Sequence, residues 1–130
     1  MRILAVDDDR ELTQLLQLVF ESRGFGVTIA NNGRQALDSL ETELPEVILL
    51  DLMMPGMSGQ EVCRQIRANP RTSNIPIIIL TAKSDTETKR EMMEAGATEY
   101  LVKPIRPIDL IQRTREAVLR SALSVAKVLT

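Results

Sequence analysis

The stretch that decides the fold is Glu46-Val-Ile-Leu-Leu-Asp-Leu-Met-Met-Pro-Gly-Met-Ser-Gly59. Its first part is an apolar run, Val47 to Leu50, that leads directly into one carboxylate, Asp51. Pro45 precedes the run and Pro55 follows it, so regular structure is expected to end on both sides. A short apolar run of this kind is typical of a fully buried strand in a parallel sheet. Asp51 is therefore predicted at the carboxyl end of that strand, the edge at which open α/β sheets bind ligands.

Apolar runs and amphipathic stretches alternate along the chain on both sides of this strand. Such alternation predicts a parallel sheet with helices on both faces, joined by right-handed crossovers. The flavodoxin-like strand order 2-1-3-4-5, a (βα)5 three-layer α/β sandwich, is the natural choice. We expect strands at Arg2–Val6, Phe25–Ala30, Glu46–Asp51, Ile75–Thr81 and Thr98–Val102, and helices at Arg10–Arg23, Arg34–Glu43, Ser58–Ala68, from Ser84 or Asp85 to about Ala95, and from Pro107 through Leu119.

The C-terminal segment goes beyond this pattern. We assign residues 1–120 to the domain and residues 121–130 to a C-terminal helical extension or the start of a linker. A helix over 108–130 would carry a partial heptad seam, although Ile111 and Val118 are better explained by packing on the sheet. A frayed tail, a linker to an output domain and a dimerisation helix all stay open for the last residues. The seam positions are Ile111, Arg115, Val118, Ala122, Val125 and Leu129.

Composition excludes several classes of function. The 130 residues fit one domain, and a net charge of −2 with only three aromatic residues gives no basis for a nucleic-acid-binding face. The absence of histidine excludes Ser-His-Asp catalysis and His-ligated zinc. The single cysteine, Cys63, excludes an internal disulfide and fits a small buried residue in a reducing cytoplasm. No stretch is long and apolar enough for a membrane span or a signal peptide.

Polar side chains end other strands at the same predicted edge as Asp51. Asp7 and Asp8 follow the first strand, Thr81 ends the fourth and Lys103 follows the fifth. The first and third strands are neighbours in the predicted sheet, and the chain reverses direction between them, which creates a crevice. Several carboxylates in one crevice repel each other, so a cation is expected among them. Because only oxygen ligands are available, Mg²⁺ fits best, while lysine and threonine suit a phosphoryl group.

This combination predicts a phosphoryl-transfer site that forms an acyl phosphate on a carboxylate. Each residue alone also has a plainer explanation. Asp8 or Asp9 could cap the following helix, and we prefer that role for Asp9. Thr81 could be an ordinary strand-end hydroxyl, and Lys103 could be a solvated surface lysine. Asp51 is harder to dismiss, and the joint pattern at one edge favours a functional site.

Four segments carry a resemblance to a known family. They are Ile3 to Asp9, Asp51 to Gly59, Leu80 to Lys83 and Ala95 to Ile105. Each segment alone is weak, but together, in order and each on its expected element, they are specific. Over roughly residues 2–120 the sequence resembles the receiver domain of two-component response regulators.

The resemblance implies a role for each acidic position. Asp51 matches the residue that becomes phosphorylated. Asp8 matches the acid that binds Mg²⁺ directly, and Asp7 the acid that usually acts through a water. The backbone carbonyl of Met53 matches a further metal ligand, and Mn²⁺ could substitute for Mg²⁺.

The resemblance also implies how the phosphoryl group is held and sensed. Thr81 and Lys103 match the hydroxyl and ammonium that contact the phosphoryl oxygens, and the Ala82 backbone N–H matches another donor. Tyr100 matches an aromatic residue that moves inward on activation. The family further implies a cis peptide bond between Lys103 and Pro104.

The implied function is a phosphorylation-activated switch rather than an enzyme with a separate substrate. The expected phosphodonor is a histidine kinase or a histidine phosphotransfer protein, and the expected output surface is the face formed by residues 85–119. That face would contact an output domain or protein, and a homodimer is also open. No direct contact with nucleic acid or membrane is expected. Met53 and Lys83, at positions that tune hydrolysis in the family, position a water poorly and predict a long-lived phosphorylated state.

Three other functions fit the sequence less well. A phosphorylation-independent receiver-like binding module would not need the intact set of site residues. A Mg²⁺-dependent hydrolase with an aspartate nucleophile usually has a second acid two residues later, where this chain has Met53, and a cap for which the length leaves no room. A flavodoxin relative that binds FMN would need a hydroxyl- and glycine-rich phosphate loop, which the sequence lacks.

Overall fold

The computed structural model describes residues 1–129, with side chains through residue 127. All the expected strands and helices are present in the expected order, and most bounds agree to within one or two residues. The strands are β1 (Arg2–Val6), β2 (Gly26–Ala30), β3 (Val47–Leu50), β4 (Ile77–Thr81) and β5 (Glu99–Val102), and the helices are α1 (Arg10–Glu21), α2 (Gly33–Thr42), α3 (Gly59–Ala68), α4 (Thr86–Glu94) and α5 (Pro107–Leu129).

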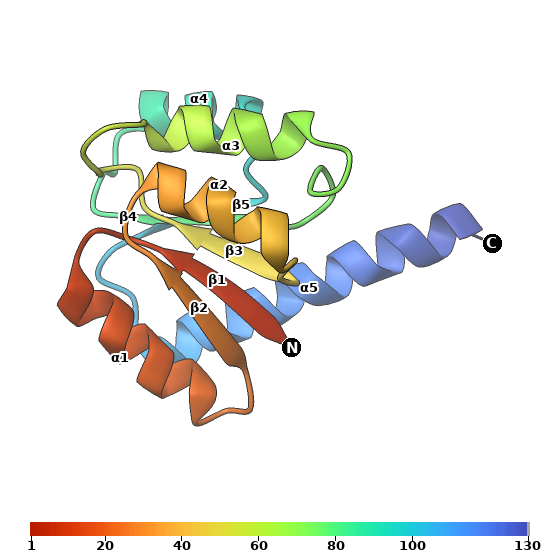
Figure 1. The fold of residues 1–130 in the computed structure, drawn as a ribbon, viewed down its shortest axis with the longest axis horizontal. Helices are drawn as coiled ribbons and strands as arrows, with labels where there is room; N and C mark the ends of the chain where they lie inside the picture. Colours follow the sequence, from red (N-terminus) through yellow and green to blue (C-terminus); the bar gives the residue numbers. More distant parts are fainter. Residues whose placement is uncertain (130) are drawn as a thin grey trace.

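The strands form one parallel sheet in the order β2-β1-β3-β4-β5, which confirms the predicted flavodoxin-like topology. Helices α1 and α5 cover one face of the sheet, and α2, α3 and α4 cover the other (Figure 1). Because Val6 of β1 pairs with Leu50 of β3, the next residues of the two strands, Asp7 and Asp51, leave the sheet side by side. The topology therefore brings two carboxylates together from distant parts of the sequence.

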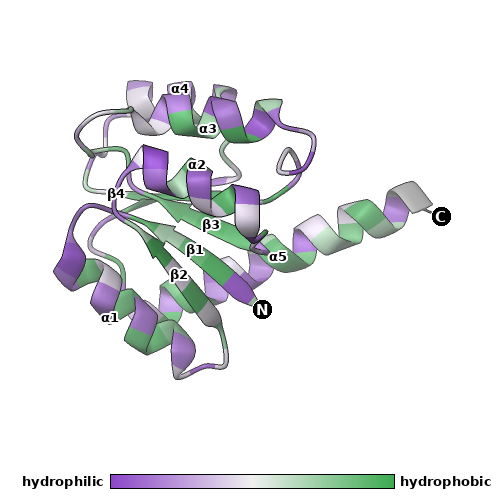
Figure 2. Cartoon of the chain, viewed as in Figure 1, coloured by the Kyte–Doolittle hydropathy of each residue, from purple (hydrophilic) through white to green (hydrophobic). Residues whose placement is uncertain are grey.

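The core consists of two aliphatic layers, one on each face of the sheet. Leu4 and Val6 point into the layer under α2 and α3, whereas Ile3 and Ala5 point into the layer under α1 and α5. The central strands are buried on both faces, so they are apolar along their length. The helices instead show alternating polar and apolar residues (Figure 2). Cys63 is fully buried in the first layer, as its sequence context predicts.

Helix caps settle which acids are structural. The Asp9 side chain accepts hydrogen bonds from the backbone N–H groups of Glu11 and Leu12, so Asp9 is the N-cap of α1. This confirms the preferred role of Asp9 and leaves the Asp8 carboxylate available for the site. At α4 the cap is Asp85 rather than Ser84, because Asp85 accepts from the Thr88 N–H at 3.0 Å.

Helix α5 is the longest element and projects beyond the rest of the domain (Figure 1). Its first half packs on the sheet, where Ile111 is buried and Val118 is partly buried, as preferred from the sequence. The seam continues to Val125, which is half exposed, whereas the side chain of Leu129 and the whole of Thr130 lie outside the described residues. Within the described part of the chain, none of the helices has the length and apolar character needed to cross a membrane.

Candidate acidic site at the carboxyl edge of the sheet

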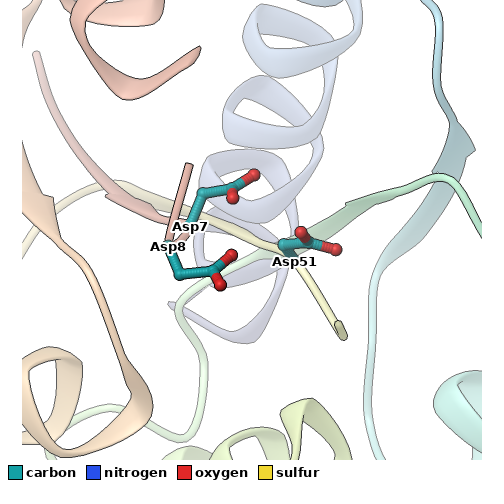
Figure 3. Close-up of side chains that lie close together, drawn as sticks. All are labelled: Asp7, Asp8 and Asp51. Carbon is teal, nitrogen blue, oxygen red and sulfur yellow. The ribbon is translucent and has the colours of Figure 1, made fainter. Parts of the chain in front are cut away.

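Three carboxylates meet where β1 and β3 end. Asp7, Asp8 and Asp51 each offer an oxygen, and these oxygens lie within 4.8 Å of one another. Figure 3 shows the three side chains gathered at this edge, two from the end of β1 and one from the end of β3. Asp7 and Asp51 are only 4% and 6% exposed, whereas Asp8 is open to solvent. The site thus has a buried floor with one accessible acid at its rim.

Asp7 is held by the loop after β1 and the loop after β2. Its Oδ1 accepts the Asp9 backbone N–H at 2.9 Å, and its backbone carbonyl accepts the Asn31 side-chain amide at 3.0 Å. Burial disfavours the charged carboxylate and raises the pKa of Asp7, and the nearby charge of Asp51 acts in the same direction. The Asp9 N–H and Lys103 oppose this shift without cancelling it. Asn31 was not singled out from sequence, since a turn asparagine after a strand gives no sign of this long-range contact.

Asp51 is positioned by the turn that follows β3. Its Oδ1 accepts the Met53 backbone N–H at 3.2 Å, and its own N–H donates to the Val6 carbonyl at 3.0 Å. The chain then folds tightly against α3, because a Cβ at Gly59 would lie 2.6 Å from the Leu52 side chain and 2.9 Å from its Cα. Only glycine allows this approach without displacement, so the start of α3 helps to fix the strand end that carries Asp51.

Lys103 joins the two buried carboxylates. Its Nζ lies 2.9 Å from Asp7 Oδ2 and 3.4 Å from Asp51 Oδ2. The Lys103 backbone N–H donates to the Thr81 carbonyl at 2.8 Å, which fixes the loop after β5 on the end of β4. The following peptide bond, between Lys103 and Pro104, is cis, as the family resemblance implies. Lys103 is therefore a partly buried member of the site and not a solvated surface lysine.

The remaining predicted residues lie on the β4 side of the site. Thr81 is fully buried, and its hydroxyl oxygen accepts the Lys83 N–H at 3.4 Å. Ala82 lies between them in an exposed loop. The Tyr100 hydroxyl donates to the Lys83 carbonyl at 2.8 Å, and its ring packs in part on the core. The structure thus connects Thr81 to Tyr100 through Lys83, which the sequence suggested only as a position that tunes hydrolysis.

The ligand set fits a hard divalent cation. All three acids offer carboxylate oxygens, which suit Mg²⁺ or Mn²⁺ better than softer metals. Opposite ligands of Mg²⁺ lie about 4.2 Å apart, so oxygens within 4.8 Å of one another need little movement to share an ion. A cation would also relieve the repulsion that contributes to the raised pKa of Asp7. The Met53 side chain is exposed, and its backbone N–H already contacts Asp51.

The fold and the site together define a flavodoxin-like α/β domain with an acidic, lysine-bridged centre at its carboxyl edge. Residues 3–115 match the response regulator receiver domain family. The chain therefore belongs to the receiver domains of two-component response regulators, a family of phosphorylation-activated signalling switches.

Similar proteins agree with this assignment. The DNA-binding response regulator MtrA of Mycobacterium tuberculosis H37Rv is 42% identical over 92% of this chain and 51% of its own length. MprA of Mycobacterium leprae is 39% identical over 93% of this chain and 52% of its own length. The chain thus spans about half the length of the curated relatives it matches.

Solved structures agree as well. The chemotaxis protein CheY4 of Vibrio cholerae superposes with a TM-score of 0.85 at 33% identity, covering 89% of this chain and 97% of that one. The receiver domain of the Francisella response regulator 1452 superposes with a TM-score of 0.84 at 34% identity. The match covers 92% of this chain and 98% of that one.

Proposed function

We propose that Asp51 accepts a phosphoryl group from the phosphohistidine of a histidine kinase or a histidine phosphotransfer protein. An Asp51 carboxylate oxygen attacks phosphorus, the bond from phosphorus to the imidazole nitrogen breaks, and the imidazole leaves with its proton restored from solvent. The product is an acyl phosphate on the protein. The observation that carries the proposal is the Lys103 bridge, which supplies a cation beside the buried Asp51 carboxylate.

The contacts of the two buried acids favour Asp51 over Asp7 as the acceptor. Both Asp7 oxygens have a close partner, at 2.9 Å in each case. The contacts of the Asp51 oxygens are longer, 3.2 Å to the Met53 N–H and 3.4 Å to Lys103. Asp51 therefore has the freer oxygens, and a nucleophile must exchange its existing contacts for a new bond.

We assign the acidic cluster as the Mg²⁺ site of this reaction. Asp8, which is exposed, would bind the ion directly together with Asp51 and the Met53 carbonyl, and Asp7 would act through a water. Bound Mg²⁺ supplies charge neutralisation between the carboxylates and the incoming phosphoryl oxygens. The role of the chain is to hold its oxygens in place before the reaction.

Lys103, Thr81 and the Ala82 N–H would then hold the phosphoryl oxygens. The modification adds about −1.5 to −2 charge and three acceptor oxygens at Asp51. Lys103 already lies between Asp7 and Asp51, so a small movement of its ammonium suffices to reach the new group. Thr81 has no exposed surface, so its hydroxyl must turn toward the site and leave space behind it.

The phosphodonor protein is expected to dock beside α1. An apolar hollow of about 310 Å³ lies between α1 and the loop after β5, and its lining includes Leu15, Lys103 and Pro104. Leu15 is half exposed, whereas its neighbour Leu16 is buried in the core. Because the hollow shares Lys103 with the acidic site, a helix packed there would bring a phosphohistidine close to Asp51.

Output is expected through the face formed by residues 85–119, which includes α4, β5 and most of α5. Tyr100 and Lys83 connect this face to Thr81. The partner would be an output domain or protein, with a second copy of the chain as a further candidate. No direct nucleic-acid or membrane contact is proposed for residues 1–120, and the protein is expected to act in the cytoplasm. Residues 121–130 would connect the domain to its output partner, since α5 continues past residue 120 without a break.

The test is intact mass after incubation with acetyl phosphate and Mg²⁺. We expect one added phosphoryl group, which is lost in Asp51→Asn and when Mg²⁺ is chelated. Asp38→Asn, at an exposed acid on α2, serves as the control and should be modified like the native chain. No phosphoryl gain in the native chain would favour a phosphorylation-independent binding module. Turnover of a phosphate ester would instead favour a hydrolase.

A further inference from the structure

A second hollow, lined by polar side chains together with Pro76, Ala117 and Val125, lies at the opposite edge of the sheet from Asp51. Its volume is about 560 Å³, within the range of small-molecule pockets. It is lined by Arg67 of α3, by residues just before β4 and β5, and by part of α5. Figure 1 shows α5 leaving the domain. The side chains that matter are Arg67, Ser73, Thr98, Arg120, Ser121 and Ser124.

Arg67 gives the hollow a fixed positive charge. Its guanidinium donates to the carbonyls of Gly96, Ser73 and Ile75 at 2.8, 3.1 and 2.6 Å, and more weakly to the Thr98 hydroxyl at 3.4 Å. All of these acceptors are neutral, and among the described residues no carboxylate forms an ion pair with Arg67. Burial disfavours the charge and lowers the pKa of Arg67 from its ordinary value. The arginine is therefore held rigidly in place without a counter-ion.

A second cation at the hollow is only partly neutralised. Arg120 lies 3.5 Å from the Glu99 carboxylate. The same carboxylate already receives Arg113 at 3.1 Å on both of its oxygens. Arg113 and Arg120 thus share one carboxylate, and Arg67 contacts only neutral acceptors. The excess positive charge favours an anion.

Hydroxyl groups complete the lining. Ser73 and Thr98 come from the loops before β4 and β5, and Ser121 and Ser124 come from α5. The Ser121 hydroxyl donates to the Asn74 carbonyl at 3.3 Å, which ties α5 to the wall of the hollow. Ser124 is exposed. Two arginines with several hydroxyls suit a phosphate, because its tetrahedrally arranged oxygens accept several hydrogen bonds.

We propose that this hollow is a binding site for a small, multiply charged phosphate compound, separate from the phosphorylation site at Asp51. Arg120 and the Nη2 group of Arg67 bind the anionic oxygens, and the Ser124 hydroxyl donates to a remaining one. The Nη2 group is available because its one hydrogen bond within the described part of the chain is the contact with the Thr98 hydroxyl at 3.4 Å. Arg67 needs no rearrangement, because backbone carbonyls already fix its orientation. Arg120 exchanges its shared contact with Glu99 for the ligand, while Arg113 keeps Glu99 paired.

The experiment uses the full chain, labelled with ¹⁵N, and inorganic pyrophosphate as the probe, without divalent cations and at constant ionic strength. We expect saturable shifts of the backbone amide signals of Asn74, Thr98 and Ser121. Arg120→Gln should weaken the apparent affinity at least about tenfold, the loss typical of one charge-assisted hydrogen bond. Ser124→Glu, which places a negative charge at the hollow, should abolish the shifts.

Two matched variants separate this site from general charge effects. Arg64→Gln removes an exposed arginine on the same helix as Arg67 and should leave the affinity unchanged. Lys103→Gln removes the cation of the Asp51 site and should leave the shifts at Thr98 and Ser121 unchanged. Shifts that do not saturate, that weaken equally in Arg64→Gln, or that occur only around Ala82 and Lys103 would overturn the proposal. Arg67 itself is not varied, because its loss would also loosen the loops it holds.

Discussion

The ammonium of Lys103 lies 2.9 Å from Oδ2 of Asp7, a residue 96 positions earlier in the chain. Burial alone would lower the pKa of Lys103, but the hydrogen bond to Asp7 and the charges of Asp51 and Asp7 outweigh it and raise the pKa. For Asp7 the balance is reversed, since burial outweighs the help from Lys103 and its pKa is raised. The ion pair thus stabilises the charged form of Lys103, but it does not offset the cost of burying the charged Asp7 carboxylate.

Replacing Lys103 by methionine should destabilise the metal-free protein at pH 7. Two buried carboxylates lose their cation, and we expect a loss of about 2 kcal/mol, below the 3–5 kcal/mol of a fully buried pair because the lysine side chain is 25% exposed. Chemical denaturation measures the change. Lys89→Met, at an exposed lysine, is the control and should be nearly neutral.

The pH dependence of this loss has a definite sign. A raised lysine pKa contributes stability that is complete below the unfolded value and is lost only as the pH rises through the folded value. A raised Asp7 pKa means that stability falls as the pH rises from the unfolded carboxyl value through the folded one. The deficit of Lys103→Met should therefore shrink toward pH 4 and on adding Mg²⁺. A deficit that stays constant with pH would show that lost packing, not charge, is responsible.

The phosphorylated state should be long-lived, because Met53 and Lys83 are poorly suited to position a water for hydrolysis. Met53 is 57% exposed and apolar, and Lys83 is occupied with Asp85 and Thr88. Introducing polar groups with Met53→Asn and Lys83→Glu should accelerate loss of the phosphoryl group by about tenfold, a modest part of what a positioned base contributes. Decay is followed by intact mass after removal of acetyl phosphate. Faster decay of the native chain than of the double variant would contradict this prediction.

Tyr100→Ala should retain phosphorylation but weaken output. The ring packs partly on the core and its hydroxyl holds the Lys83 carbonyl, so its loss removes the connection from Thr81 to the 85–119 face. Tyr100→Phe keeps the ring and removes only the hydrogen bond, and it should show an intermediate effect. The measurement is the change in partner affinity on phosphorylation. An unchanged response in Tyr100→Ala would rule out this connection.

Leu15→Glu should slow phosphotransfer from a protein donor while leaving modification by acetyl phosphate unchanged. Leu15 lines the hollow beside Lys103, so a charge there would oppose docking without touching Asp51. We expect at least about a tenfold loss in transfer rate, since burying an unpaired charge at an interface costs several kcal/mol. Leu44→Glu, at an exposed leucine before β3, is the matched control. Equal slowing with both donors would place the effect in the chemistry rather than in docking.

The fold could be predicted because each strand carries its own signal. The run before Asp51 is apolar on both faces, and the isoleucines of β4 are β-branched, so buried parallel strands follow from local pattern alone. Strand ends were less accurate. Ile75, for example, precedes β4, since its carbonyl accepts Arg67 instead of pairing in the sheet. The length of α5 was left open, because its second half has few tertiary contacts that sequence could reveal.

The carboxylates of the acidic site could be predicted, because they follow parallel strands whose carboxyl ends meet at one edge of the sheet. Asp7, Asp8 and Asp51 lie together for that reason. The contact of Lys103 with both buried acids was not predictable, because it depends on how the loop after β5 crosses the sheet edge. Arg67 was missed altogether, since a lone arginine on a helix gives no sign that its partners are carbonyls of other loops.

The order in which the site is completed has a consequence for synthesis of the chain. The contacts of Lys103 with Asp7 and Asp51 join residues that are far apart in the sequence. Such contacts form late in folding, because strand pairing must first offset the entropy lost in closing the loop. Lys103 and Tyr100 belong to the last strand and the loop after it, more than 45 residues after Asp51. A nascent chain therefore contains Asp51, the proposed acceptor, well before it contains the lysine that pairs with this carboxylate. Under the proposed function, only the finished domain therefore has the complete site for phosphorylation.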